Sequence, residues 1–581
     1  GHSVNKGEWI TRLMGEYKDG YPDLKKPGQA KWLSDDYVKF FRFAQSRIEQ
    51  TGYGVLAFIS NHGYLDNPTF HGMRRSLMKT FDDIFVLDLH GSVKKKEKAP
   101  DGSKDENVFD IQQGVSIGLF VKRKNGTDSK PAKIHHAEVW GPREIWETDA
   151  KGNRNLIGGK YRYLYDHDVR TTKWTRVKPR DPFQLFVPQN ASVLAEYESG
   201  WSLADIFSPS GDPAPGMVTT HDEFAISWTA EESAEKIRRF LKTTSEEDAR
   251  AIFRLCSQSQ WDYARAKNEL KDGAWKEKVT PVLYRPFDVR WTVYDPNVAV
   301  HRRVRVSRHM LAGENLGLGT TRSVEIGRGW EHVFCTRYLI QHHTVSIKEV
   351  NYLFPLYLYV DHGDAAEDLE EMAAREEARA YGIRRRANLS AGFVEEVAGR
   401  VKLAFVGDGT GDLKKTFGPE DVFDYLYAVL HSPAYRARYA PFLRMDFPRV
   451  PVTSDRKLFA ALVGLGRRLR GLHLLETAAE GGASFPVAGD NTVAAVRYTE
   501  ALGRVHINDA QYFEGVSPAV WNFHVGGYQV CEKWLKDRRR RALDYDEITR
   551  YLQIVAALGA TLALTSQIDT VIAAHGGWPL G

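Results

Sequence analysis

The sequence predicts an α/β protein in which a partial Rossmann-like sheet is followed by a region of mixed α+β structure. Apolar runs at residues 54–60 and 84–89 are short and sharply bounded, which is typical of strands buried on both faces. Between them, residues 67–81 begin with Asn-Pro and carry apolar side chains at helical spacing. A third apolar run, at 114–121, follows a polar, lysine-rich loop. This order matches the second half of a doubly wound sheet, and we expect the first half to precede residue 1.

The rest of the chain shows local patterns of other kinds. Residues 1–50 predict amphipathic helices, and glycine turns between short apolar stretches at 134–165 predict a hairpin. Residues 280–360 are rich in valine, tyrosine and tryptophan in alternation and predict strands. Helices are expected at 229–270, 419–446, 455–477 and 545–574. These patterns predict three domains: a sheet domain over 1–130, a linker with a hairpin extension over 131–228, and a domain with helical and strand-rich parts over 229–581.

Composition places the chain among ordinary globular proteins, with 42% apolar and 27% charged residues in a length of 581. No apolar run approaches the roughly 18 residues that suggest a membrane-spanning helix, so we expect no membrane contact. Cys256, Cys335 and Cys531 are scattered and predict neither a disulfide framework nor a metal site, which fits a cytoplasmic protein. The net charge of +5 is mild and leaves a polyanionic partner open.

Two residues of the sheet domain are candidates for a binding site. Asn61, followed by His62, comes at the carboxyl end of the first predicted strand, where open α/β sheets bind their ligands. Phe109 lies in the loop before the third strand. Pattern alone favours other roles for both: a capping asparagine in a strand-to-helix turn, and a loop phenylalanine that packs against the sheet edge.

The segment from Tyr284 to Arg308 combines arginines with aromatic residues. Because a guanidinium group binds phosphate or guanine with two parallel hydrogen bonds, these arginines are candidate nucleic-acid contacts. Internal ion pairs with Asp288 explain the same pattern, and the sequence leaves both interpretations open. The candidate arginines are Arg285, Arg290, Arg302, Arg303, Arg305 and Arg308.

Weaker candidates lie elsewhere. The lysine run Lys94, Lys95 and Lys96 is usually a solvated surface feature but can contact backbone phosphate. A zinc site at His342 and His343 is disfavoured because no second ligand pair lies at a suitable spacing. The sequence has no phosphate-binding loop, no nucleophile elbow and no His-Glu-x-x-His pair.

Longer stretches resemble a known family. Residues 52–70, 85–91 and 107–116 resemble the C-terminal half of an adenine-N6 DNA methyltransferase domain, in the variant found in Type ISP restriction–modification enzymes. Four further stretches are similar to the C-terminal specificity region of that family: 284–291, 351–357, 447–455 and 521–536.

The resemblance implies a partial Rossmann-like methyltransferase sheet followed by a mixed α+β specificity region. It implies S-adenosylmethionine as cofactor and double-stranded DNA as partner, with the target adenine flipped into a pocket. Phe109 matches the family's base-stacking aromatic residue, and Asn61 would lie at the pocket edge. Sequence recognition would fall to the six arginines named above, followed by Arg322, Gln341, His342 and His343.

The family's catalytic Asn-Pro-Pro-Tyr and its glycine-rich cofactor motif are absent from the sequence, and we expect both upstream of residue 1. The same holds for the translocase and nuclease regions of full-length members, so the chain alone should be inactive. The main alternative is a free-standing DNA-binding specificity subunit without catalysis. An unrelated α/β enzyme is a weaker alternative, because it would need a complete active site of its own.

Overall fold

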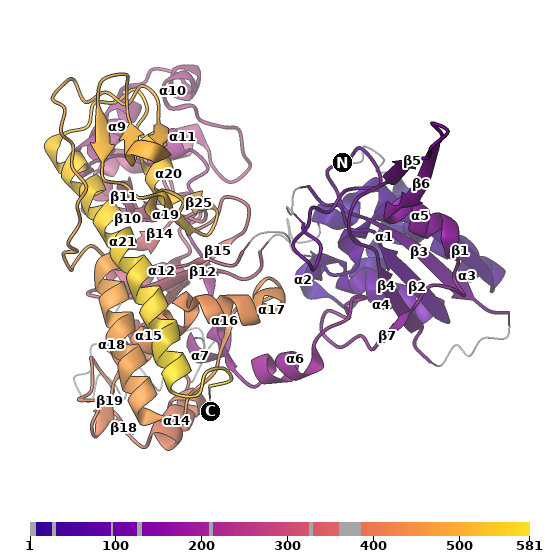
Figure 1. Cartoon of the computed structure of the whole chain (residues 1–581). Helices are drawn as coiled ribbons and strands as arrows, with labels where there is room; N and C mark the ends of the chain where they lie inside the picture. The colour runs from indigo at the N-terminus through magenta and orange to yellow at the C-terminus, as the bar shows by residue number, and fades with distance from the viewer. Residues whose placement is uncertain are drawn as a thin grey trace. The chain divides into compact units, whose positions relative to one another are not determined.

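In the computed structural model, residues 7–25, 31–93, 97–124, 130–207, 213–324, 329–359 and 385–580 are described. They form two compact units, one ending at Ala191 and the other beginning at Ser192 (Figure 1). This division differs from the predicted boundaries at 130 and 228, because the predicted linker contributes strands and helices to both units.

Unit 1 is built on a five-stranded sheet of order β1-β3-β2-β4-β7. Its strands are β1 (Gly54–Asn61), β2 (Asp83–Asp88), β3 (Val115–Lys122), β4 (Lys133–Glu138) and β7 (Thr175–Val177). The three predicted strands are therefore confirmed. Strand β3 runs antiparallel to both of its neighbours, so β1 and β2 point the same way and their carboxyl ends meet at one edge of the sheet.

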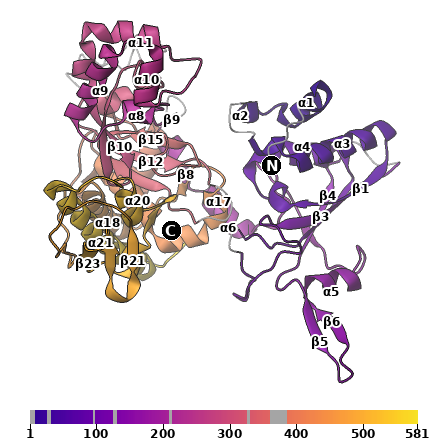
Figure 2. The same cartoon turned by 90° about the horizontal axis from the view of Figure 1, so that it is seen from above.

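Helices cover one face of this sheet (Figure 2). They are α1 (Glu8–Gly15), α3 (Asp36–Thr51) and α4 (His71–Thr80), and they pack around fully buried aromatic side chains such as Phe41 and Phe120. The prediction that the first strand is buried on both faces is wrong. Strand β1 is the edge of the described sheet, and Val55 and Ile59 on its other face are 64% and 49% exposed.

The predicted hairpin is confirmed as β5 (Ile145–Thr148) and β6 (Arg154–Gly158), followed by helix α5 (Gly159–Asp166). The hairpin projects away from the sheet, whereas α5 lies closer to it (Figure 2). Tyr161, Tyr163 and Leu164 of α5 pack on a small apolar cluster that contains Leu89 and Val108.

The sheets of unit 2 include one of order β13-β12-β15-β9 and one of order β11-β10-β14. Their strands are β9 (Ala214–Pro215), β10 (Val279–Arg285), β11 (Asp288–Val293), β12 (Gly317–Thr321), β13 (Val333–Thr336), β14 (Leu339–Ile340) and β15 (Asn351–Pro355). The principal helices are α6 (Ala191–Glu198), α9 (Ala230–Lys242), α10 (Glu246–Phe253), α11 (Tyr263–Glu269), α14 (Ala391–Val401), α15 (Pro419–His431), α16 (Pro433–Arg438), α18 (Arg456–His473), α20 (Val530–Lys536) and α21 (Tyr545–Ala574). The predicted helices beginning near 229, 419, 455 and 545 are confirmed.

One basic segment differs from the prediction. Residues Val304–Leu311 form helix α12 instead of a strand. Arg303 adopts a left-handed backbone conformation, with φ of 55°, and directly precedes the first turn. Ser307 and Met310 are buried, because they lie one helical turn apart on the inward face.

Among the described helices, α21 is the one whose length and apolar composition would suit a membrane span. It packs instead against α15, α18 and α19 (Pro518–Trp521), with Ile554, Leu558 and Thr561 buried along one face. This is the packing of a core helix of unit 2.

Helices α15 and α18 cross at very short range. A β-carbon added at Gly466 of α18 would lie 1.8 Å from the carbonyl oxygen of Asp424 of α15, so only glycine fits the crossing. Asp424 also accepts a hydrogen bond from Arg470 Nε at 2.6 Å, which fixes the register between the two helices.

We expect Gly466→Ala to lower the free energy of unfolding of unit 2 by about 1–3 kcal/mol or more, because the added methyl group would force the backbones of α15 and α18 apart. Gly464→Ala is the matched control, since a β-carbon at this exposed position meets nothing within 4 Å. Alanine there should stabilise the helix by up to about 1 kcal/mol. Urea unfolding of both variants tests the contact, and equal midpoints would contradict it.

Candidate functional site

A polar cavity of about 280 Å³ lies at the edge of the unit 1 sheet where β1 and β2 end. His62 directly follows β1, and His90 follows β2 by two residues. From β4 come His136 and Glu138, and Glu97 completes this side of the lining. The site therefore lies where the direction of the strands predicts a ligand site.

Asp88 at the end of β2 organises this edge. Its carboxylate lies 3.0 Å from His62 Nδ1, 3.7 Å from His90 Nδ1, and accepts a hydrogen bond from the His90 backbone amide at 2.9 Å. Burial alone would raise the pKa of Asp88, but the two histidines outweigh burial and hold it well below its usual range. His90 Nε2 in turn lies 3.1 Å from Glu138 Oε2. A carboxylate thus orients each histidine ring.

Asn61 takes the capping role that its sequence pattern favoured. Its Oδ1 accepts a hydrogen bond from Gly63 N at 2.8 Å, which begins the 3₁₀ turn His62–Tyr64. This turn places His62 in the cavity. Contact between Asn61 and a target base stays a prediction.

Phe109 is displayed at the surface by a loop whose base is held by hydrogen bonds. Its side chain is 45% exposed, so the alternative of a packed loop phenylalanine is not favoured. The buried Asn107 side chain donates to Gly91 O at 2.9 Å and Gln113 O at 2.6 Å, and accepts from Phe109 N at 2.8 Å. Asn107 therefore spans the base of the loop and fixes the backbone beneath the exposed ring.

A fully buried ion pair anchors the same loop. Lys160 Nζ lies 2.8 Å from Asp105 Oδ1, and neither side chain is exposed. Lys160 also donates to Leu89 O and Glu106 O, both at 2.6 Å. Asp105 accepts from the amides of Gly91 and Gly141. The pair joins α5, the end of β2 and the Phe109 loop.

In unit 2 the structure brings four predicted residues together. The buried Gln341 side chain accepts from Arg285 Nη1 at 3.1 Å and from His343 N at 2.7 Å, and its Nε2 lies 2.9 Å from His342 Nδ1. Burial, reinforced by the charge of neighbouring groups, lowers the pKa of His342 to about 4, so this ring is neutral at pH 7. Arg285 is itself 7% exposed and stacks on Tyr284. These contacts make a prearranged polar cluster.

Arg290 does not join that cluster. It pairs at 2.7 Å with Asp288, which is 1% exposed and also binds Arg538 at 3.0 Å. The guanidinium of Arg290 lies 3.4 Å from the centre of the Trp228 ring. Burial and pairing favour the internal ion-pair interpretation over DNA contact for Arg290.

The remaining predicted residues fall in three groups. Among the described residues, Arg302 and Arg303 form no ion pair; Arg303 is exposed, whereas Arg302 is half-buried against Tyr294. Arg305 and Arg308 are half-buried on α12, and Arg322 pairs with Asp446 at 2.8 Å. Lys94, Lys95 and Lys96 lie outside the described residues.

Sequence reasoning missed His90, Asp105 and Lys160. For His90 a signal existed, since it follows the second strand as His62 follows the first. No local signal marks the Asp105–Lys160 pair, because it joins residues from different elements with no shared motif.

Solved structures show that this fold is shared with restriction–modification enzymes. The Type ISP enzyme LlaBIII bound to DNA aligns with a TM-score of 0.64 and 17% identity over 96% of this chain and 35% of its own. A nuclease-deletion mutant of the Type ISP enzyme LlaGI, in complex with a DNA substrate mimic, aligns with a TM-score of 0.61 and 17% identity. This alignment covers 96% of this chain and 42% of the LlaGI chain. A DrdV–DNA complex aligns with a TM-score of 0.61 and 20% identity, over 97% of this chain and 54% of the DrdV chain. The chain thus spans about a third to a half of the length of these proteins.

The sequence comparison gives the family. Residues 211–567 match the family model described as the Type ISP C-terminal specificity domain, which covers more than half of the chain. The chain therefore belongs to the Type ISP specificity family. No curated protein matches it.

The buried ion pair gives a stability prediction. Lys160→Met should lower the free energy of unfolding of unit 1 by about 3–5 kcal/mol, because it leaves the Asp105 carboxylate buried without its counterion. Lys104→Met is the matched control: its side chain is 82% exposed and pairs with Glu106 at 3.0 Å, so its loss should cost at most about 1 kcal/mol. Urea unfolding with hydrogen exchange resolved to residues 97–113 measures both. Equal protection in the two variants would refute the anchoring role.

Proposed function

We propose that this chain binds double-stranded DNA and presents the target adenine for N6 methylation, as part of a Type ISP-like restriction–modification polypeptide. Unit 1 supplies the target-base side of the methyltransferase pocket, and unit 2 recognises the DNA sequence. Family membership over residues 211–567 supports the recognition role, and so do the DNA complexes of the three similar proteins. The translocase and nuclease regions are assigned to the upstream polypeptide.

The observation that carries the methyltransferase role is the exposed ring of Phe109 on a loop held by hydrogen bonds at its base. The active site cannot reach the N6 atom of an adenine that is stacked inside a duplex. The enzyme must therefore flip the base out and hold it. A flat apolar ring on a preorganised loop holds a flipped base by stacking, without a cost for ordering the loop. Asn107 and the Asp105–Lys160 pair supply that order.

S-adenosylmethionine would supply the methyl group. The proposal assigns most of its site, with the Asn-Pro-Pro-Tyr motif, to sequence before residue 1, and gives no described residue a role in holding it. The open edge of β1 supports this arrangement. Strand β1 is eight residues long, and a further strand can pair with its open edge. Val55 and Ile59 are exposed on one face of β1, and further helices can cover that face.

For DNA contact in unit 2, Arg302 and Arg303 are the favoured pair. They lie beside the polar cluster of Gln341, because residues 217–218 pair with His301 on one side and with Gln341 on the other. Guanidinium groups without an internal carboxylate partner can bind phosphate at little cost. The buried Arg290 would first have to leave Asp288.

Phe109→Ala in the complete enzyme should weaken target-base stacking by about 1–3 kcal/mol and slow single-turnover methyl transfer accordingly. The matched control is Ile111→Ala, which removes another exposed apolar side chain, 47% exposed, from the same loop. A fluorescent base analogue at the target position reports base flipping directly. If the two variants methylate and flip equally well, Phe109 is not the stacking residue.

Reversing the charge of Arg302 and Arg303 to glutamate should weaken DNA binding at least tenfold and reduce the salt slope by about two units, one for each lost phosphate contact. Lys414→Glu with Lys415→Glu is a control of equal charge change on exposed residues of the same unit. Fluorescence anisotropy over a salt series measures both quantities. An identical loss in the two double variants would indicate a net-charge effect instead of a local contact.

A further inference from the structure

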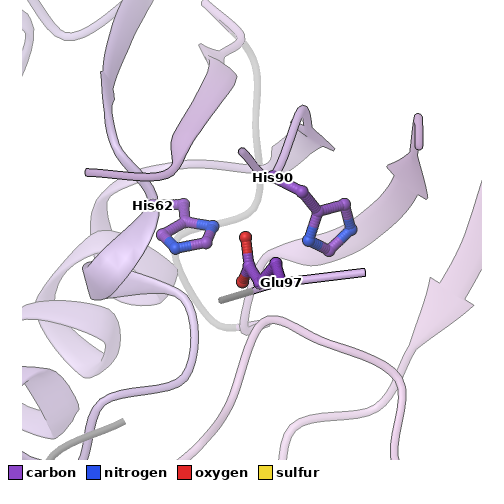
Figure 3. A group of neighbouring side chains, drawn as sticks. All are labelled: His62, His90 and Glu97. Carbon is purple, nitrogen blue, oxygen red and sulfur yellow. The ribbon is translucent and has the colours of Figure 1, made fainter. Parts of the chain in front are cut away.

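Three metal-ligating side chains converge in the unit 1 cavity. His62, His90 and Glu97 each offer a ligand atom, and these atoms all lie within 4.8 Å of one another. The Glu97 carboxylate lies between the two imidazole rings (Figure 3). Both histidines are buried, and Glu97 is half-buried. His62 follows β1, whereas His90 and Glu97 both lie between β2 and β3, so the fold brings the first ligand to the other two.

The surroundings match those of metal-binding histidines. In metal sites a ligating imidazole usually has its second nitrogen bound to a carboxylate or carbonyl, which fixes the ring and its tautomer. Here Asp88 lies 3.0 Å from His62 Nδ1, and Glu138 lies 3.1 Å from His90 Nε2. Glu97 is held as well, since its Oε2 accepts a hydrogen bond from Ser92 N at 2.8 Å. The three carboxylates also favour a cation over an anion in the cavity.

An independent observation points to a ligand in the same cavity. His136 lines it, is 3% exposed, and its Nε2 has no hydrogen-bond partner among the described residues. A buried polar atom without a partner costs about 1–3 kcal/mol, so such atoms usually mark a bound water, ion or small molecule. A metal ion with a coordinated water would satisfy this nitrogen.

We propose that His62, His90 and Glu97 bind one divalent transition-metal ion, with zinc the best match to two imidazoles and one carboxylate. A water molecule completes the coordination and hydrogen-bonds to His136 Nε2. The ion joins Glu97 to the carboxyl ends of β1 and β2. Because Gly91, next to His90, binds both Asp105 and Asn107, metal binding also tightens the loop that carries Phe109.

The experiment uses the 581-residue chain without DNA, so its outcome is independent of the proposed function. The protein is first freed of metal with a chelator. It is then titrated with Co²⁺, and afterwards with Zn²⁺. We expect one equivalent of Co²⁺ with the visible absorption of a low-coordinate site, lost when Zn²⁺ displaces it. Hydrogen exchange in residues 97–113 should slow in the zinc-bound protein.

Glu97→Gln should lower the affinity for Co²⁺ at least tenfold, and this half-buried residue can change without loss of the fold. His135→Gln is the matched control, because His135 lies on the neighbouring strand β4 and pairs with Asp83 at 3.3 Å, outside the cavity. It should bind metal as the parent chain does. The proposal is overturned if the parent chain binds no stoichiometric Co²⁺, if Glu97→Gln binds equally well, or if His135→Gln loses the metal.

Discussion

The Asp105–Lys160 ion pair is the interaction on which unit 1 depends for its functional edge. Two charges without solvent contact are unfavourable unless every donor and acceptor is satisfied, and here the backbone supplies the remaining partners. Those partners belong to the end of β2, the Phe109 loop and the segment between β4 and β5. The pair therefore couples α5 to the segments that follow β2 and β4 and to the loop that carries Phe109.

Periodicity in the sequence predicted the strands and helices of unit 1 but not the exposure of β1. An apolar run such as residues 54–60 fits a central strand and an edge strand equally well. The sequence therefore does not show that one face of β1 is exposed. The segment Val304–Leu311 was mispredicted for a related reason. Its alternation of arginine and valine has the period of a strand, yet packing against β14 and β15 selects a helix with Ser307 and Met310 inside.

Among the arginines of unit 2, residue type and spacing could not distinguish structural residues from candidate DNA contacts. Arg290 and Arg538 share the carboxylate of Asp288 and lie against Trp228, at 3.4 Å and 4.7 Å from its ring centre. Arg302 and Arg303 carry the same charge only twelve and thirteen residues further along the chain from Arg290, without such a partner among the described residues. The difference lies in long-range contacts, to Arg538 above all, that no local pattern encodes.

The order β1-β3-β2 also governs when unit 1 can form during synthesis. Strand β1 makes its sheet hydrogen bonds with β3, and β3 ends only at Lys122. Until the ribosome has passed that residue, β1 and β2 have no common partner strand, and the apolar side chains of both strands stay exposed. A non-local pairing of this kind is slow and leaves strand edges open to misassembly. Synthesis therefore holds the cavity edge unformed until β3, and after it β4 with His136 and Glu138, has emerged.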